Sequence, residues 1–207
     1  MGTKLKKNAE TVTDIDGNVY HTVTIGAQTW MVENLKTTKY RNGESIANVT
    51  DNDGWNELRS GAYCNYYNSD ENGITYGKLY NWFAVNDSRN IAPTGWHVST
   101  DSEWTTLINY LGEEKAGRKL KEAGKSHWEK PNKGATNSSG FTALPGGDRS
   151  GNGGTFLSIG RYGHWWSSSE GDSGYAWDRL MRCDDGDDVT RKRSSKEWGL
   201  SVRCLRD

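Results

Sequence analysis

The segment STDSEWTTLINYLGEE, residues 99–114, carries the clearest pattern of regular structure in the chain. Thr100 is followed three positions later by Glu103, the spacing of a capping box at a helix N-terminus. Four apolar residues then recur at i, i+3, i+4 and i+7 and form one stripe: Trp104, Leu107, Ile108 and Leu111. Gly112 suits the C-terminal stop. We predict a helix from Thr100 to about Leu111 that buries this stripe.

Strand patterns lie on the N-terminal side of this helix. TVTDIDGNVYHTVTI, residues 11–25, alternates apolar and polar residues around Asp16-Gly17, which predicts a β-hairpin. IGAQTWMVENL, residues 25–35, adds a turn and a further strand. DIDGN resembles part of a calcium loop, but its glycine comes fourth where the helix-loop-helix motif needs it sixth. The hairpin is therefore the favoured interpretation.

The other segments are less regular. Residues 40–87 are rich in Tyr, Asn and Gly, and YGKLYNWFAV within them is ambiguous between a short helix and a strand. AGRKLKEA, residues 116–123, predicts a short second helix, and GFTALPGG, residues 140–147, a strand entering a glycine turn. No repeat or linker divides the chain. We expect one α+β domain over residues 10–207, preceded by a flexible arm or an expression remnant at residues 1–9.

The composition indicates an aromatic core. Only 33% of the 207 residues are hydrophobic, but 10 are Trp and 10 are Tyr, each of which buries a large area. The 25 Gly and 3 Pro favour tight turns and irregular loops.

Charge and hydropathy give no indication that the chain binds nucleic acid or inserts into a membrane. A net charge of −1, from 26 basic and 27 acidic side chains, gives no indication of a nucleic-acid partner. No apolar run reaches the length of a membrane helix, so we expect no direct membrane insertion. The N-terminal MGTKLKKN shows no export signal, which leaves open whether one was removed.

The cysteines number three: Cys64, Cys183 and Cys204. With an odd number, at least one is free or pairs between chains. No CxxC occurs, so a zinc site built on paired cysteines is not indicated. One disulfide is possible, and the cysteines do not indicate in which cellular compartment the protein is found.

The C-terminal stretch WWSSSEGDSGYAWDRLMRCDDGDDVTRKRSSKEWGLSVRCLRD, residues 165–207, has strand-like ends and a middle of no simple pattern. We interpret the ends as scaffold and the middle as a binding surface, because loops on a rigid frame tolerate sequence change. The strand period places Asp178, Leu180 and Arg182 on one side and Trp177, Arg179 and Met181 on the other. Ten residues are predicted to bind ligand on one solvent-accessible face: Tyr175, Asp178, Leu180, Arg182, Asp184, Asp185, Asp187, Asp188, Arg193 and Trp198.

Five blocks of the chain resemble, in order, the Fibrobacter succinogenes major paralogous domain. They are TVTDIDGNVYHTVTIGAQTWMVENLKTTKY, APTGWHVSTDSEWTTLINYLG, GATNSSGFTALPGG, GHWWSSSE and WGLSVRCLRD. That family is similar in fold to the C-type lectin domain, in the branch of the formylglycine-generating enzymes. The resemblance implies an α+β fold with two main helices, small mostly antiparallel sheets and long loops. It also implies a bacterial surface or exported lipoprotein. Ala92 stands where relatives often carry Cys, so a disulfide at that position is lost.

The segment after Trp177 departs from the family, whose members are often rich in Tyr and Asn there. Its residue types are those that an Asn codon, AAC, reaches when its adenines mutate, and in this it resembles the targets of diversity-generating retroelements. The resemblance implies a variable segment at about residues 170–198. We expect a non-catalytic, receptor- or adhesin-like protein that presents variable residues to a protein or glycan ligand on another cell or surface. Its carrier would be a bacterial surface or a phage particle.

Catalytic and metal-binding patterns are not found. The four histidines fall into no metal or triad motif, and His97 is favoured as a strand residue. The lectin triplets that bind calcium are missing, so we expect no cofactor, no metal and no calcium requirement for folding. The aspartates at 184–188 are favoured as a solvated loop rather than a cation site. The basic run at 191–193 is expected to balance them across a hairpin.

Two alternatives remain beside the ligand-binding interpretation. One is an ordinary surface lipoprotein domain with a structural or a glycan- or protein-binding role. The other is an oxidase of the formylglycine-generating type, for which Cys183 and Cys204 are the only C-terminal thiols. The tandem Trp165 and Trp166 are expected in the core rather than in a sugar-stacking platform.

Overall fold

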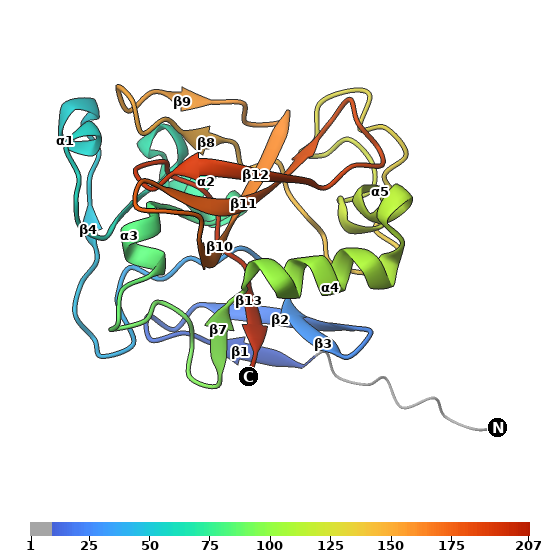
Figure 1. Ribbon diagram of the computed structural model, residues 1–207, viewed down its shortest axis with the longest axis horizontal. Helices are drawn as coiled ribbons and strands as arrows, with labels where there is room; N and C mark the ends of the chain where they lie inside the picture. Colours follow the sequence, from blue (N-terminus) through green and yellow to red (C-terminus); the bar gives the residue numbers. More distant parts are fainter. Residues whose placement is uncertain (1–9) are drawn as a thin grey trace.

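The computed structural model describes residues 10–207. Strands dominate, with five helices and two 3-10 turns between them (Figure 1). The α+β class with small, mostly antiparallel sheets is confirmed. Among these helices only α4 (Asp101–Leu111) is longer than seven residues. None of the helices within residues 10–207 has the length and apolar character needed to cross a membrane. The predicted arm at residues 1–9 lies outside the described residues.

The largest sheet joins the two ends of the chain. Its five strands are β1 (Thr11–Thr13), β2 (Val19–Ile25), β3 (Gln28–Met31), β13 (Cys204–Arg206) and β7 (Trp96–Val98), in that spatial order. The C-terminal β13 lies between β3 and β7 (Figure 1). The predicted hairpin of β1 and β2 is confirmed, and Gly17 takes a φ of 84° at its turn. The other helices and strands lie above this sheet in Figure 1.

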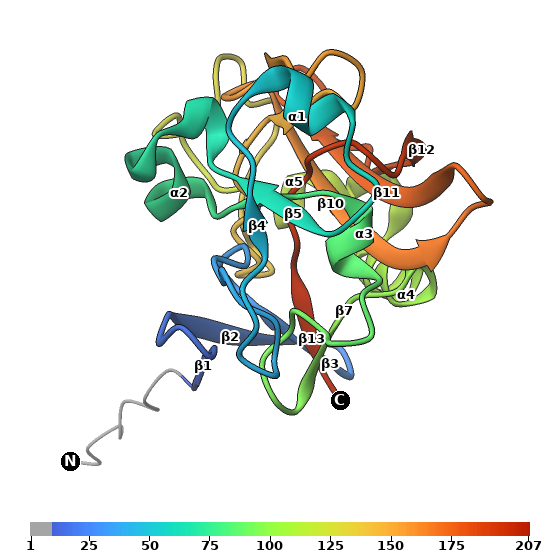
Figure 2. The same ribbon diagram turned by 90° about the vertical axis from the view of Figure 1, so that its left-hand side faces the viewer.

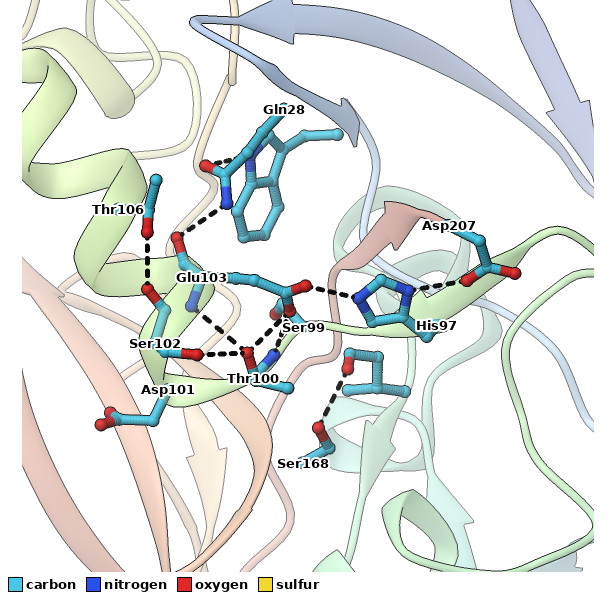
Figure 3. A network of polar contacts seen from close by, with 12 residues as sticks. Gln28, His97, Ser99, Thr100, Asp101, Ser102, Glu103, Thr106, Ser168 and Asp207 are labelled. Carbon is cyan, nitrogen blue, oxygen red and sulfur yellow. Dashed lines mark hydrogen bonds and ion pairs between the residues drawn. The ribbon is translucent and has the colours of Figure 1, made fainter.

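Helix α4 has the predicted cap. The Thr100 hydroxyl accepts from the Glu103 N–H at 3.2 Å, and the Glu103 carboxylate accepts from the Thr100 N–H at 2.7 Å (Figure 3). The stripe of Trp104, Leu107 and Leu111 is buried, and Ile108 is half-buried against the same cluster. The predicted second helix is α5 (Ala116–Leu120), which follows the 3-10 turn η2 (Glu113–Lys115).

His97 lies in β7, as predicted, and connects three elements (Figure 3). Its Nε2 is 2.8 Å from Glu103 Oε1, and its Nδ1 is 2.7 Å from Asp207 Oδ1. Burial alone would lower the pKa of His97, but hydrogen bonds to Asp207 and Glu103 raise it above the ordinary value. The strand, the helix cap and the C-terminal residue therefore share one polar network.

A second sheet carries the C-terminal segment. It consists of β10 (Tyr162–Glu170), β11 (Tyr175–Arg182) and β12 (Thr190–Ser195), all antiparallel. Trp165 and Trp166 in β10 are fully buried and point to opposite sides, into two different core clusters. Their indole N–H groups donate to Asn34 Oδ1 and to the Tyr80 carbonyl, each at 2.8 Å. The prediction that both belong to the core is confirmed.

The core is aromatic, as predicted. Six tryptophans are less than 2% exposed: Trp30, Trp55, Trp104, Trp128, Trp165 and Trp166. Three arginines are equally buried: Arg149, Arg179 and Arg203. Arg203 satisfies its guanidinium with Asn34 Oδ1 and the carbonyls of Met31 and Phe141. Buried hydrogen-bonded cations thus supplement the few aliphatic residues.

The cysteines are free and buried, each in a different core cluster. The disulfide that the sequence left open is not formed among residues 10–207, which include all three cysteines.

Short elements cover the side that faces the viewer in Figure 2. They are β4 (Ala47–Asn48), α1 (Asn52–Asn56), β5 (Ala62–Cys64), η1 (Tyr66–Asn68), α2 (Asp70–Tyr76), β6 (Leu79–Tyr80) and α3 (Trp82–Val85). The ambiguous YGKLYNWFAV contains both a strand and a helix. The strand predicted for GFTALPGG is wrong, because Gly140 and Thr142 take positive φ and leave only isolated bridges. The hairpin of β8 (Asp148–Arg149) and β9 (Phe156–Leu157) follows it.

Candidate functional site

Strands β11 and β12 and the loop between them, residues 175–195, are called the ribbon below. Trp177 lies opposite Arg193 and Arg179 opposite Arg191, so these side chains share one side of the ribbon. Arg179 contacts α4, and this side is called the helix side. Residues 176, 178, 180 and 182 point to the far side. On the far side, His164 of β10 faces Asp148 of β8.

The ten predicted ligand-binding residues do not share one face, so that expectation is wrong. Tyr175 and Arg193 lie on the helix side, whereas Leu180 and Arg182 lie on the far side. The period of two correctly grouped Asp178, Leu180 and Arg182. It also assigns Tyr175, at an odd position of the same strand, to the opposite side.

Asp178 is fully buried, which contradicts its predicted accessibility. Its carboxylate lies 3.0 Å from His164 Nδ1 and accepts from the Ser194 hydroxyl at 2.9 Å. His164 Nε2 is 3.9 Å from a second buried carboxylate, Asp148. Burial raises the pKa of Asp148, although the neighbouring His164 opposes this. Asp178 is therefore part of the frame of the ribbon.

On the helix side, two arginines converge on the first residue of α4. Arg179 Nη1 is 2.6 Å from Asp101 Oδ1, and Arg191 Nη2 is 2.9 Å from Asp101 Oδ2. Burial alone would raise the pKa of Asp101, but bonds from Arg191 and Arg179 lower it below the ordinary value. The Arg191 guanidinium also stacks 3.3 Å from the ring centre of Trp177.

The predicted pairing of the basic run with the acidic loop is wrong. Arg191 pairs with Asp101, and Arg193 pairs with Asp172. The reason is the register: Arg191 and Arg193 alternate with Lys192 and point toward α4 and the 171–174 turn.

An exposed aromatic and cationic patch forms the end of the helix side. Tyr175 is 47% exposed, and the Arg193 guanidinium lies 5.4 Å from its ring centre and 5.7 Å from that of half-buried Trp177. Aromatic rings and arginines are the side chains that most often dominate binding energy at protein interfaces. Of this patch, the sequence prediction contained Tyr175 and Arg193 but missed Trp177 and Arg191. The strand period of two, applied from Tyr175, places Trp177 on the same side and could have identified it.

The acidic residues 184–188 form a loop at the other end of the ribbon. The Asp185 carboxylate accepts from the N–H of Asp187 at 3.0 Å, and such backbone bonds lower the pKa of Asp185. Asp187 pairs with Arg118. Buried Lys121 donates to the carbonyls of Arg182 and Asp185 at 2.9 and 2.8 Å. Burial lowers the pKa of Lys121 to about 8. The loop is fixed from within by protein cations, and Asp184 and Asp188 remain exposed.

No three His, Cys, Asp or Glu side chains within residues 10–207 are arranged to hold a metal ion. Trp198, the last predicted residue, is half-buried against the core cluster that contains Trp166. Lys192 Nζ lies 5.5 Å from its ring centre on the far side. The ribbon thus has two separate accessible surfaces, with Tyr175, Trp177, Arg191 and Arg193 on one and Leu180, Arg182 and Lys192 on the other.

Comparison with known protein families gives a match over most of the chain. The sequence model of the Fibrobacter succinogenes major domain matches residues 23–206, a range that contains α4 and the complete ribbon. No curated protein matches the chain.

Proposed function

This chain belongs to the Fibrobacter succinogenes major domain family, and on that premise we propose that it is a non-catalytic, receptor- or adhesin-like protein that binds its ligand through the ribbon. The fold would be of the C-type-lectin type, in the branch of the formylglycine-generating enzymes. The ligand would be a protein or a glycan on another cell or surface. The carrier would be a bacterial surface or a phage particle.

The observation that carries this proposal is that one sheet contains both a buried strand and an exposed strand. Strand β10 is held in the core by Trp165 and Trp166, while β12 exposes Arg191, Lys192 and Arg193. The strands pair through backbone hydrogen bonds, which do not depend on the identity of the exposed side chains. Substitution of exposed residues away from special contacts changes stability by about 0.5 kcal/mol or less. Such a ribbon can change its surface without losing its frame.

We propose further that a diversity-generating retroelement rewrites the segment at about residues 170–198. Buried Asp178 and Arg179 limit which positions can vary, because each holds a partner in the frame. The neighbouring DNA tests this. A reverse-transcriptase gene and a near-copy of this segment that differs at adenines should be found. The differing codons should include those of exposed residues such as Tyr175, Arg182 and Arg193 and should spare Asp178 and Arg179. A near-copy that is absent, or that differs mainly at buried positions, would remove the diversification proposal.

The binding role is tested by block exchange. In the exchange variant, Ser replaces four residues at once: Tyr175, Arg182, Lys192 and Arg193. Its melting temperature should stay within a few degrees of the wild-type value, and its binding to surface fractions of other cells should be abolished. A matched control replaces the exposed residues Tyr67, Ile74 and Tyr110, which lie outside the ribbon. Binding that survives the ribbon exchange but not the control exchange would refute the proposal.

The oxidase alternative is disfavoured by the thiols. Cys183 and Cys204 lie in different core clusters. Burial raises the pKa of Cys204 to about 12, which favours the neutral thiol, whereas such chemistry needs the thiolate. The alternative of a purely structural surface domain predicts no loss of binding on ribbon exchange, so the same experiment separates it.

A further inference from the structure

Strand β12 is an edge of its sheet. The sheet has the order β10, β11, β12, so β12 pairs with β11 on one side only. None of residues 190–195 takes part in an isolated bridge within residues 10–207. The exposed residues Arg191, Lys192 and Arg193 follow one another in the middle of this strand. An exposed edge presents unpaired backbone N–H and C=O groups, which can pair with a further strand.

The direction of the backbone groups in β12 follows from the ladder. The Lys196 N–H donates to the Gly174 carbonyl at 3.0 Å, and this pair continues the register of β11 and β12. In an antiparallel ladder, pairs that exchange hydrogen bonds alternate with pairs that do not. Lys192, at an even position like Lys196, therefore bonds to β11. The N–H and C=O groups of Arg191 and Arg193 point outward and have no backbone partner within residues 10–207.

The opposite edge of the same sheet is closed. The carbonyl of Tyr162 accepts from the Gly147 N–H at 2.9 Å, and that of His164 accepts from the Ser201 N–H at 3.2 Å. The Trp166 N–H donates to the Ser201 carbonyl at 3.0 Å. The fold thus satisfies the outward groups of β10 from within the chain and leaves those of β12 to solvent or to a partner.

A second copy of this chain would be a poor partner for this edge. Two antiparallel β12 strands that pair around Lys192 place Lys192 opposite Lys192 and Arg191 opposite Arg193. Like charges directly opposite each other destabilise a strand pair. Charged side chains on edge strands are also a common protection against pairing between identical molecules. The sequence of β12 therefore favours a different chain as its partner.

Lys192 is the cation of this edge that lacks an ion pair. Arg191 and Arg193 pair with carboxylates on the helix side, whereas Lys192 is exposed on the far side and forms no ion pair within residues 10–207. Asp178 lies opposite Lys192 in the register, but it is fully buried and bonded to His164. A residue of an added strand would lie on the other side of Lys192, where an acidic side chain is favoured as a cross-strand partner.

We propose that β12 binds an extended segment of a partner protein by strand addition, with backbone hydrogen bonds to Arg191 and Arg193 and an acidic residue opposite Lys192. The proposal rests on the proposed function and narrows the ligand from a protein or a glycan to a protein. Strand addition takes its affinity from main-chain hydrogen bonds, and the side chains add specificity. This mode of binding therefore persists when the side chains of the ribbon change.

Nuclear magnetic resonance of the ¹⁵N-labelled protein tests the edge with the pentapeptide acetyl-Thr-Val-Glu-Val-Thr-amide. In the free protein, the amide hydrogens of Arg191 and Arg193 should exchange with solvent faster than those of Lys192 and Ser194, which bond to β11. A dissociation constant on the order of 1 mM is expected for so short a strand. At about 5 mM peptide, exchange at Arg191 and Arg193 should then slow by about sixfold.

Two matched peptides separate backbone from charge. A peptide that is N-methylated at both Val residues lacks the N–H donors for the carbonyls of Arg191 and Arg193, and it should bind at least about tenfold more weakly. A peptide with Lys in place of Glu keeps those donors. It should bind about two- to fivefold more weakly, as expected for one cross-strand charge pair.

Two protein variants make the same separation from the other side. Arg193→Pro removes an outward N–H at a position where an edge strand tolerates proline, and Arg193→Ala loses the same side chain but keeps the N–H. The proline variant should bind the Glu peptide roughly fivefold more weakly than the alanine variant. Melting curves identify a proline variant that fails to fold, and the N-methylated peptide then carries the test with the wild-type protein.

Three results would overturn the proposal: unchanged exchange at Arg191 and Arg193 with the peptide, equal binding of the N-methylated peptide, or equal binding by the two variants at position 193. Slowed exchange at β1 or β7, the edges of the other sheet, in place of β12 would do the same. The ribbon exchange described above does not use these peptides. If the peptide fails while that exchange still abolishes binding to surface fractions, strand addition alone is removed and a glycan ligand is favoured.

Discussion

At the scale of single residues, Asp178 and Leu180 show how two neighbours on one side of a strand differ in role. Asp178 is fully buried and bonded to His164 and Ser194, while Leu180 is half-buried on the same side. Strand periodicity gives the side but not what covers it. Asp178 is hydrogen-bonded to His164, which lies 14 positions away in the chain.

These two residues give matched variants. Asp178→Ala should lower the free energy of unfolding by about 3–5 kcal/mol, because it leaves buried His164 without its carboxylate. Leu180→Ser should lower it by about 1 kcal/mol or less. Urea denaturation followed by tryptophan fluorescence measures both. Equal costs would show that Asp178 is not part of the frame.

Trp104 is the largest buried side chain of α4. It is fully buried, and its ring centre lies 5.0 Å from Trp30 and 5.6 Å from Phe141. Trp104→Ala should lower the free energy of unfolding by roughly 3–5 kcal/mol through the cavity it leaves. Its indole N–H has no hydrogen-bond partner within residues 10–207, so Trp104→Phe should cost much less. A cost below 1 kcal/mol for Trp104→Ala would contradict this account.

At the scale of elements, His97 links β7, α4 and the C-terminal residue that follows β13. Its two carboxylate partners, Glu103 and Asp207, come from the helix and from the C-terminus (Figure 3). Their hydrogen bonds raise the pKa of His97 in the folded state above its ordinary value of about 6.5. The protonated form therefore stabilises the fold. Its contribution is complete below the unfolded pKa and is lost as the pH rises through the folded value.

His97→Gln tests this sign. The difference in free energy of unfolding between the wild type and the variant should be larger at about pH 6 than at about pH 9. Asp207→Asn, which removes one of the two carboxylate partners, should reduce that pH dependence without abolishing it. A difference that grows toward alkaline pH would show that neutral His97 is the stabilising form.

The ribbon is the other element whose neighbours decide its role. Arg191 and Arg193 pair with Asp101 and Asp172 instead of the closer aspartates in the chain, because the register turns them toward α4 and the 171–174 turn. The acidic loop is instead bonded to Arg118 and Lys121. The basic run and the acidic loop are close in the sequence, but this closeness did not predict the ion pairs that their residues form.

At the scale of the whole molecule, three core clusters hold the layers together. Cys64, Cys183 and Cys204 each belong to a different cluster. Burial raises the pKa of Cys64 to about 11 and that of Cys204 to about 12. Neutral, enclosed thiols react slowly with thiol reagents.

Thiol titration therefore reports on global unfolding. With a disulfide-exchange reagent, none of the three cysteines should react rapidly in the native protein, and all three should react in denaturant. A reducing agent should leave the melting temperature unchanged. One thiol that reacts rapidly under native conditions would show local opening of its cluster, and fewer than three in denaturant would reveal a disulfide.

The sequence by itself determined the local structure: the capped helix α4 with its buried stripe, the hairpin at Gly17, the strand at His97 and the aromatic core. The helix, the hairpin and the strand follow from residues within about one or two turns or one strand pair, where hydrogen-bond geometry and side-chain period act directly. The aromatic core follows from the composition of the whole chain. The tertiary structure alone decided the burial of Asp178 and the partners of Arg191 and Arg193. These depend on contacts between residues 14 to 90 positions apart. A side-chain period defines two faces of a strand, but only the packing of other elements determines which face meets solvent.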